Sequence, residues 1–177
     1  MRHPVNSEKL CQWAKSRGEL RDLESNLWHL VAFMRKEFDL RRFLRARQAP
    51  TAAKLQAVYE KPPFKKAESF DFVFEALDRA EKVDAARTVL EEVWTFLLAH
   101  ESVQVVTVQS PVMLETHTEN EIADSLAKSL HKTVWLHVRV NPALVAGLVI
   151  EVAGGKTYDY SLKGAFAHLK YFLMEKR

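Results

Sequence analysis

The 177-residue sequence predicts an α+β protein, with an N-terminal six-helix bundle followed by a small C-terminal α/β domain. Up to about His100, apolar residues recur every three or four positions, the spacing of helices that bury one face. Beyond residue 102 apolar and polar residues alternate, which is typical of strands. We therefore expect two domains, residues 1–101 and 102–177, that meet near residues 101–103.

Two long apolar stripes define the main helices of the first domain. One runs from Leu20 to Phe38 and the other from Val83 to Leu98. A short helix that carries Trp13 comes before Gly18, because glycine commonly ends helices in a left-handed conformation. Prolines separate three further helices between the stripes, at residues 40–47, 51–60 and 69–80.

The second domain is predicted to have the order strand–helix–strand–strand–helix. Valines between residues 103 and 108 predict the first strand, because β-branched residues favour extended backbone. A capping box of Thr118 and Glu121 predicts the start of a helix. Residues 134–140 and 148–152 predict the next two strands, and Gly154–Gly155 a turn. After Asp159 we expect a last helix, with an apolar stripe of Leu162, Phe166, Leu169 and Leu173.

The composition is that of a folded protein with a mild basic excess. Apolar residues make up 47% and charged residues 28% of the chain, and the formal net charge is +3. Cys11 is the one cysteine, which excludes a disulfide framework and a zinc site built on cysteines within the chain. No apolar run reaches the roughly 18–20 residues that a membrane span needs. We expect a soluble, intracellular protein that does not insert into the membrane.

The sequence contains no recognisable catalytic, cofactor-binding or metal-binding motif. Its seven histidines do not have the i, i+4 spacing of a helical metal site. Phosphate-binding glycine loops and the GxSxG nucleophile motif are missing, and the glycines of residues 153–156 fit a hairpin turn better. Cys11 lies between Leu10 and Trp13, where a small buried apolar side chain is the simplest interpretation. We expect no cofactor, no metal and no enzymatic activity.

Two segments of the C-terminal half carry a recognisable pattern. Residues 138–152 (VRVNPALVAGLVIEV) and 158–166 (YDYSLKGAF) resemble the C-terminal signature of the ATP synthase delta subunit family, whose mitochondrial relative is the oligomycin sensitivity-conferring protein. Residues 10–20 and 40–44 are similar to the family's helical half. The family's opening tyrosine and basic residue are replaced here by residues 4–7, and Tyr160 stands in place of a glycine. The signature positions are Val145, Gly147, Asp159, Ser161 and Gly164.

The resemblance implies a connector without catalytic function. In that family the helical domain sits on the catalytic head of an F-type ATP synthase and receives N-terminal helices of the alpha subunits. The smaller domain meets the C-terminal ends of the peripheral-stalk b subunits, and the connector resists rotor torque. The resemblance also implies a peripheral membrane protein on the cytoplasmic face of the bacterial plasma membrane. It places the alpha-subunit groove at the first and fifth helices, at Leu10, Trp13, Ala14, Phe70, Phe74 and Leu77.

The residues themselves leave alternatives open at this groove and for the whole chain. Phe70 and Phe74 lie one helical turn apart and suit a core as well as a partner groove. Trp13 is either a partner anchor or an ordinary core residue. The element order from Thr118 onward also suits a double-stranded-RNA-binding domain, although the near-neutral charge of that half argues against binding to a nucleic-acid backbone. A free-standing helical adaptor is the third possibility.

Overall fold

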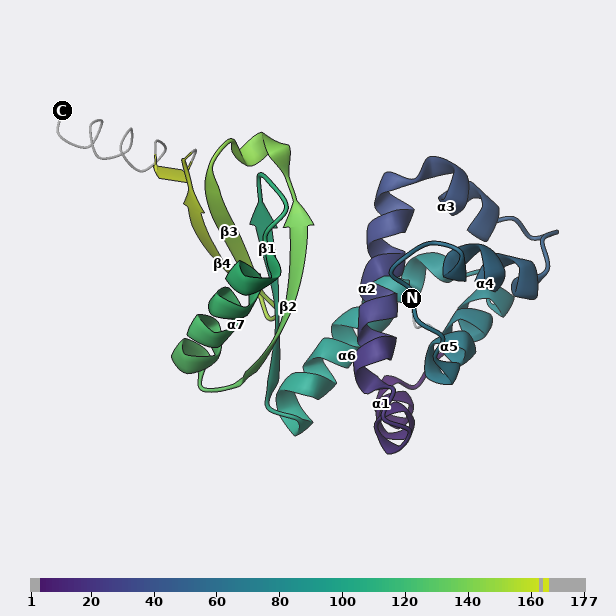
Figure 1. Ribbon diagram of the computed structural model, residues 1–177. Coiled ribbons are helices and arrows are strands. Elements are labelled where there is room, and N and C mark those ends of the chain that lie inside the picture. The colour runs from purple at the N-terminus through teal and green to yellow at the C-terminus, as the bar shows by residue number, and fades with distance from the viewer. Residues whose placement is uncertain (1–3, 163, 166–177) are drawn as a thin grey trace, which may run out of the picture. The chain divides into compact units, whose positions relative to one another are not determined.

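The computed structural model describes residues 4–162 and 164–165. Within them the chain is α+β, with helices in the first hundred residues and a four-stranded mixed sheet after them (Figure 1). The chain divides into two compact units, Met1–Phe96 and Leu97–Arg177. This division falls within the helix α6 (Ala86–His100), a few residues before the junction expected at 101–103.

The first unit, here the helical unit, begins with a helix that has local signals at both of its ends. The Asn6 side chain accepts a hydrogen bond from the Lys9 N–H at 3.1 Å and caps the first helix. Gly18 follows that helix at φ +72°, a conformation that suits glycine. The elements are α1 (Ser7–Ser16), α2 (Leu20–Lys36), α3 (Phe38–Leu44), α4 (Thr51–Tyr59), α5 (Glu68–Arg79), the 3-10 helix η1 (Val83–Ala85) and α6.

The core of the helical unit consists of the apolar stripes of these helices. Phe70 and Phe74 on α5 are completely buried, and their ring centroids are 6.2 Å apart. Phe38 does not continue the stripe of α2 as the spacing predicted. The backbone at Glu37 is extended (ψ 100°) and breaks the helix, so Phe38 begins α3 with 64% of its surface exposed. The other apolar side chains of this unit that are at most 1% exposed are Cys11, Ala14, Leu23, Leu27, Leu30, Leu44, Val58, Val73, Leu77, Ala86, Val89 and Val93.

Buried polar side chains connect helices that are distant in sequence. The Lys54 ammonium and the Thr51 hydroxyl, both on α4, each donate to the Asp78 carboxylate of α5 at 2.6 Å. The Asn26 amide donates to the Lys65 carbonyl at 2.6 Å and accepts from the Lys65 N–H at 3.1 Å. Each pair satisfies groups that would be costly to bury alone, so these contacts fix how the helices and the loop before α5 pack.

The second unit, here the sheet unit, has the strand order β2-β1-β3-β4. β1 and β2 are parallel and α7 connects them, as parallel neighbours require a crossover. The pairs β1–β3 and β3–β4 are antiparallel. The elements are β1 (Val103–Ser110), α7 (Thr116–Leu130), β2 (Thr133–Val140), the 3-10 helix η2 (Pro142–Leu144), β3 (Gly147–Val152) and β4 (Lys156–Ser161).

The core of the sheet unit lies between α7 and one face of the sheet (Figure 1). Val106, Val108 and Val152 form its buried centre. Alternate residues of a strand share a face, which brings these valines together on the side that α7 covers. The partly buried side chains packed against them are Leu114, Ile122, Leu126, Leu130, Val134, Leu136, Leu148 and Ile150.

Two features of the sheet unit differ from the predicted order. β4 is an additional strand, since the expected order went directly from the third strand to a helix. α7 begins at Thr116, two residues before the capping box of Thr118 and Glu121, and its N-cap residue Glu115 makes no side-chain capping bond. Of the predicted last helix, residues 162 and 164–165 are described and helical. Phe166, Leu169 and Leu173 lie outside the described residues.

Candidate functional site

An exposed aromatic pair joins α1 and α5 of the helical unit. The ring centroids of Trp13 and Phe72 are 5.8 Å apart in an edge-to-face arrangement, with interplanar angle 72°. Trp13 is 37% and Phe72 55% exposed. Adjacent exposed aromatic rings are typical of partner-binding surfaces, because they offer large apolar contact area at low conformational cost. We call these two residues the aromatic pair.

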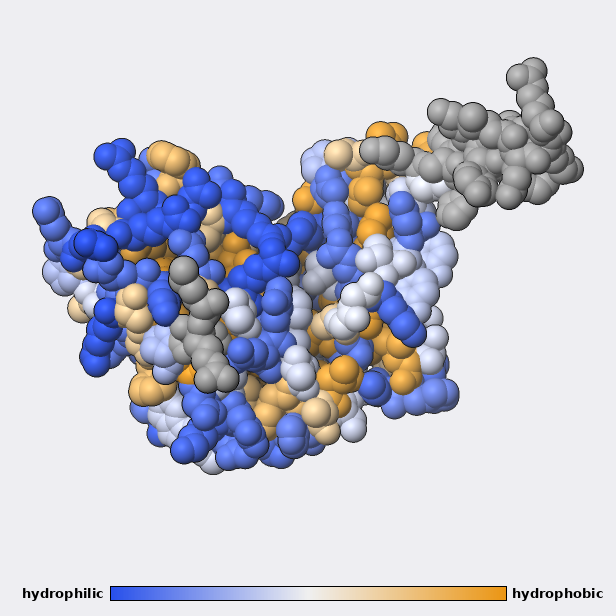
Figure 2. Space-filling view, turned by 180° about the vertical axis from the view of Figure 1, so that it is seen from behind, coloured by the Kyte–Doolittle hydropathy of each residue, from blue (hydrophilic) through white to orange (hydrophobic). Residues whose placement is uncertain are grey.

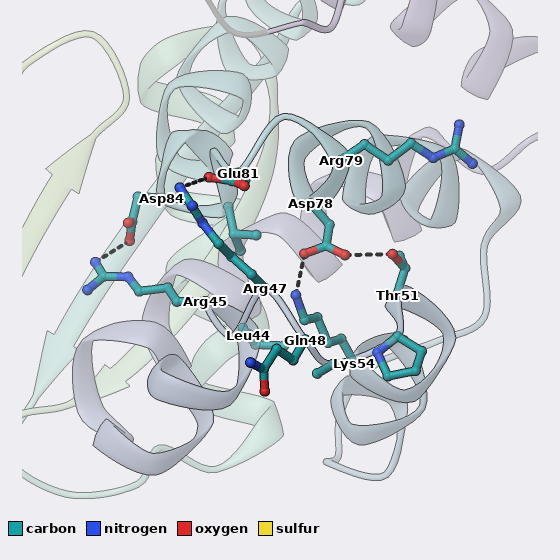
Figure 3. A pocket seen from close by; sticks show the side chains of 13 residues that line it. Leu44, Arg45, Arg47, Gln48, Thr51, Lys54, Asp78, Arg79, Glu81 and Asp84 are labelled. Carbon is teal, nitrogen blue, oxygen red and sulfur yellow. Dashed lines mark hydrogen bonds and ion pairs between the residues drawn. The ribbon is translucent and has the colours of Figure 1, made fainter.

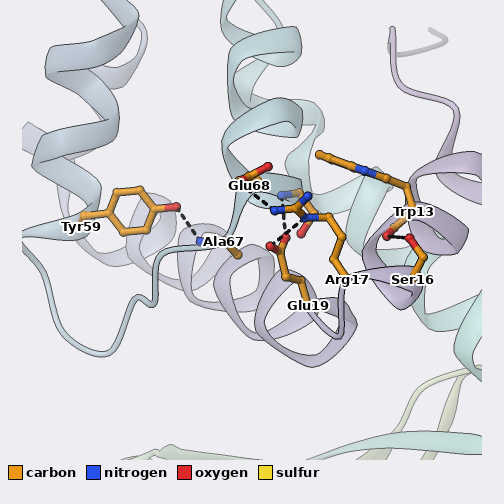
Figure 4. A network of polar contacts seen from close by, with 8 residues as sticks. Trp13, Ser16, Arg17, Glu19, Tyr59, Ala67 and Glu68 are labelled. Atoms are coloured by element: carbon orange, nitrogen blue, oxygen red, sulfur yellow. Dashed lines mark hydrogen bonds and ion pairs between the residues drawn. The ribbon is translucent and has the colours of Figure 1, made fainter.

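Arg17 fixes the surroundings of the aromatic pair (Figure 4). Its guanidinium carbon lies 5.7 Å from the centre of the Trp13 ring, within cation–π range. The same guanidinium contacts Glu68 at 2.7 Å and Glu19 at 3.2 Å. Glu19 in turn accepts a hydrogen bond from the Ser69 N–H at 2.9 Å. That backbone bond, followed by the smaller effect of Arg17, lowers the pKa of the Glu19 carboxyl despite the opposing effect of desolvation.

The structure places the six residues predicted to bind the alpha subunit in two different environments. Trp13 is the exposed member, on the surface beside Phe72. The other five are core residues that are at most 3% exposed, namely Leu10, Ala14, Phe70, Phe74 and Leu77. Phe72 was not among the predicted residues. Its position two residues from both Phe70 and Phe74 was the available signal, because such a residue lies on the opposite face of a helix.

The signature positions of the C-terminal half come together where β3 begins and β4 ends. Gly147 has φ +84° and pairs with Ser161, and a Cβ atom there would lie 2.2 Å from the Tyr160 carbonyl oxygen. The Ser161 hydroxyl accepts from the Gly164 N–H at 3.0 Å, and Asp159 accepts from the Ser161 N–H at 2.9 Å. Gly147 is therefore required for close backbone approach, and Ser161 caps the turn that follows β4.

Val145, the remaining signature position, has an unusual backbone. Its φ of +63° and ψ of −56°, with a hydrogen bond from the Ala146 N–H to the Leu144 carbonyl at 2.6 Å, define a γ-turn. A β-branched residue rarely adopts positive φ, and such strained backbone costs about 1–3 kcal/mol. The side chain is 76% exposed.

Exposed apolar residues gather at one end of the sheet. The strand directions place the ends of β1, β2 and β4 and the beginning of β3 at this end, which is the upper one in Figure 1. The connecting segments 111–114 and 140–146 contain no Asp, Glu, Lys or Arg. Figure 2 shows hydrophobic side chains at this end of the sheet unit. We call it the apolar sheet end, formed by Val112, Met113, Val140, Val145, Tyr160 and Leu162.

A charged pocket of about 720 Å³ lies between the α3–α4 loop and the end of α5 (Figure 3). Arg45 contacts Asp84 at 2.7 Å, and Arg47 is paired with Glu81. The buried Lys54 ammonium is held by Asp78 within the same pocket. Arg79, the fourth cation of the lining, pairs with Glu75 at 2.9 Å, so each cation of the pocket already has a carboxylate partner.

The described residues hold no arrangement suited to chemistry at a metal or a reactive thiol. No group of three or more His, Cys, Asp or Glu side chains in residues 4–162 and 164–165 could hold a metal ion. Burial, reinforced by the charge of Glu92, raises the pKa of the Cys11 thiol to about 12, so the side chain stays protonated at neutral pH. Among the described helices none is long and apolar enough to cross a membrane.

The family model described as "ATP synthase delta (OSCP) subunit" matches residues 7–173 of the chain. The chain is similar to ATP synthase subunit delta of Nocardia farcinica, with 27% identity over 171 residues, which cover 94% of this chain and 61% of that relative. It is also similar to the subunit delta of Natranaerobius thermophilus, with 22% identity over 93% of this chain and 90% of the relative.

The structural comparison agrees in fold. A chain in a cryo-EM structure of the Toxoplasma gondii mitochondrial ATP synthase hexamer superposes with a TM-score of 0.58. The match covers 95% of this chain and 94% of that one, with 13% sequence identity. Since the identity is low, the comparison establishes a shared fold and no more.

A third sequence relative is the subunit delta of Paramagnetospirillum magneticum. It is 27% identical to this chain over 91% of this chain and 88% of its own length.

Proposed function

Because the chain belongs to the ATP synthase delta (OSCP) subunit family, we propose that it is the connector subunit of an F-type ATP synthase. In this role it links the catalytic head to the peripheral stalk and resists rotor torque during proton-driven ATP synthesis. It catalyses no reaction itself. The observation that carries the proposal is the family match over residues 7–173, which includes both the helical unit and the sheet unit.

The helical unit is the proposed contact with the head. We assign to it the family's six-helix bundle, residues 1–101, and to the aromatic pair the binding of an alpha-subunit N-terminal helix. An amphipathic helix laid on a groove gains most of its affinity from a few large apolar anchors. Trp13 and Phe72 support this assignment because they are exposed, adjacent and contributed by α1 and α5.

The sheet unit, residues 102–177, is the proposed contact with the peripheral-stalk b subunits. The apolar sheet end supports this assignment, because contiguous exposed apolar side chains on a soluble unit usually mark an interaction surface. With its two contacts the chain would be held as a peripheral subunit of the ATP synthase, on the cytoplasmic face of a bacterial plasma membrane. No nucleic acid takes part in this function.

Affinity purification tests the proposal directly. The full chain carrying an affinity tag is expressed in its own organism, the membranes are solubilised in mild detergent, and co-purifying proteins are identified by mass spectrometry. We expect alpha and b subunits in stoichiometric amounts. Recovery of double-stranded RNA that is lost at high salt, without ATP synthase subunits, would instead support the RNA-binding alternative. Recovery of unrelated proteins alone would support a free-standing adaptor.

A further inference from the structure

Val145 combines two properties that are each unfavourable in an isolated chain. Its backbone is in a γ-turn at φ +63°, where a β-branched side chain is strained. Its apolar side chain is 76% exposed to water. Strained backbone persists where surrounding contacts impose it, and it is concentrated at functional positions.

The contacts on both sides of Val145 impose this turn. Before it, the Asn141 side chain accepts from the Ala143 N–H at 3.2 Å, and the Asn141 N–H donates to the Ser110 carbonyl at 2.7 Å. After it, the Leu162 N–H donates to the Ala146 carbonyl at 3.0 Å. These hydrogen bonds connect the turn to β1 on one side and to the residue after β4 on the other. They therefore hold the backbone of Val145 in position.

The surroundings of Val145 define the chemistry of the partner. Val145 lies in segment 140–146, which has no charged side chain, and the neighbouring segment 111–114 has none either. Met113 is 83% and Tyr160 66% exposed at the same end of the sheet. The exposed apolar side chains at this end match an apolar partner face. The exposed carboxylate of Asp159 lies beside Tyr160 in β4, at the border of this surface.

We propose that Val145 is the central anchor of the stalk contact, held in a strained turn so that its side chain enters the apolar face of a peripheral-stalk helix. The inference rests on the proposed function. In this proposal Val145 lowers the stability of the free chain. Binding of the stalk subunit, which covers the Val145 side chain, offsets that cost. The free chain and the complex should therefore respond to changes at this position in opposite directions.

Three substitutions in the full-length chain separate backbone strain from side-chain contact. Val145→Gly removes both, so we expect a melting temperature higher by about 2 °C or more. We also expect a dissociation constant for the soluble b subunit of the same ATP synthase that is raised about tenfold or more. Val145→Ala should weaken binding similarly with a smaller gain in melting temperature. Val145→Leu should keep the affinity within about threefold of the unmodified chain. Phe38→Ala, an exposed residue of the helical unit, is the matched control and should leave the affinity unchanged.

The outcomes distinguish this inference from the proposed function. If the unmodified chain binds the b subunit and Val145→Gly binds equally well, the anchor role is wrong while the connector function stands. A lower melting temperature of Val145→Gly would contradict the strain. If the unmodified chain binds no b subunit in this titration, the proposed function fails and the inference with it. Sedimentation is the final check, because a dimer of the chain that Val145→Gly disrupts would assign this end to self-association instead.

Discussion

The Glu19 carboxylate accepts a hydrogen bond from the backbone N–H of Ser69, 50 residues further along the chain, at 2.9 Å. Ser69 lies in the first turn of α5, whose N-cap residue Ala67 makes no side-chain capping bond. A side chain from the turn between α1 and α2 thus satisfies a donor at the start of α5. The arrangement joins three helices at the point where the aromatic pair is displayed.

Without this cap, the free energy of unfolding should fall less steeply as the pH is lowered. The pKa of Glu19 is lowered in the folded state, so its contribution is present above the ordinary value of 4.5 and is lost as the pH falls through the lower, folded pKa. We expect Glu19→Ala to reduce the free energy of unfolding by about 1 kcal/mol at neutral pH and by less near pH 3. Urea unfolding of both chains across this range measures the difference. A difference that stays constant with pH would contradict the role of the charge.

The buried ion pair between α4 and α5 should be sensitive to removal of one partner. Lys54→Ala leaves the Asp78 carboxylate buried with the Thr51 hydroxyl, and we expect a loss of about 3–5 kcal/mol in the free energy of unfolding. Arg87→Ala breaks a pair with Glu91 whose side chains are both more than half exposed, so it serves as control at less than about 1 kcal/mol. Chemical denaturation measures both, and equal losses would refute the distinction.

The aromatic pair should contribute to binding more than to stability. Trp13→Ala and Phe72→Ala each remove an exposed ring, so we expect a small change in melting temperature and a loss of on the order of 2 kcal/mol in binding an alpha-subunit N-terminal peptide. Phe70→Ala removes a buried ring from α5, the helix that also carries Phe72. It should lower the free energy of unfolding by about 3–5 kcal/mol. Calorimetric melting and peptide titration of the three variants test this. A large stability loss with unchanged peptide affinity would make Trp13 a core residue.

The two units should behave as separate cooperative structures. The change from helical to strand spacing near residues 101–103, and the division of contacts between Phe96 and Leu97, motivate this expectation. Limited proteolysis of the full chain should leave a stable helical fragment of about 100 residues, identified by mass spectrometry. Simultaneous digestion of both halves, without any persistent fragment, would argue for a single cooperative core.

Sequence spacing predicted the α+β class and most helices because burial of one helix face leaves a period that is visible in the chain. It failed where contacts distant in sequence decide. In β4, Tyr158 and Tyr160 alternate with the polar Thr157 and Asp159, which is a strand pattern, but all four side chains are exposed and the stretch lacks the aliphatic residues that marked the other strands. Its pairing with β3 provides the stability that its own sequence does not reveal.

The candidate surfaces were predictable in part. The resemblance directed attention to α1 and α5, and the spacing of Phe70 and Phe74 identified them as possible core residues. The contact between Trp13 and Phe72 joins positions in different helices, and sequence spacing carries no information about such a distance. The positive φ of Val145 also depends on tertiary contacts, since valine itself disfavours it.

The place of β1 in the sheet has a mechanical consequence. β1 follows α6 after two residues and is the strand through which the sheet unit continues from the helices. It pairs with β2 along its whole length and with β3 on its other side. Tension applied along β1 therefore acts across ladder hydrogen bonds that lie transverse to the pull, so that many must break together. A pull perpendicular to β1 would instead break these bonds one at a time, at a much smaller force.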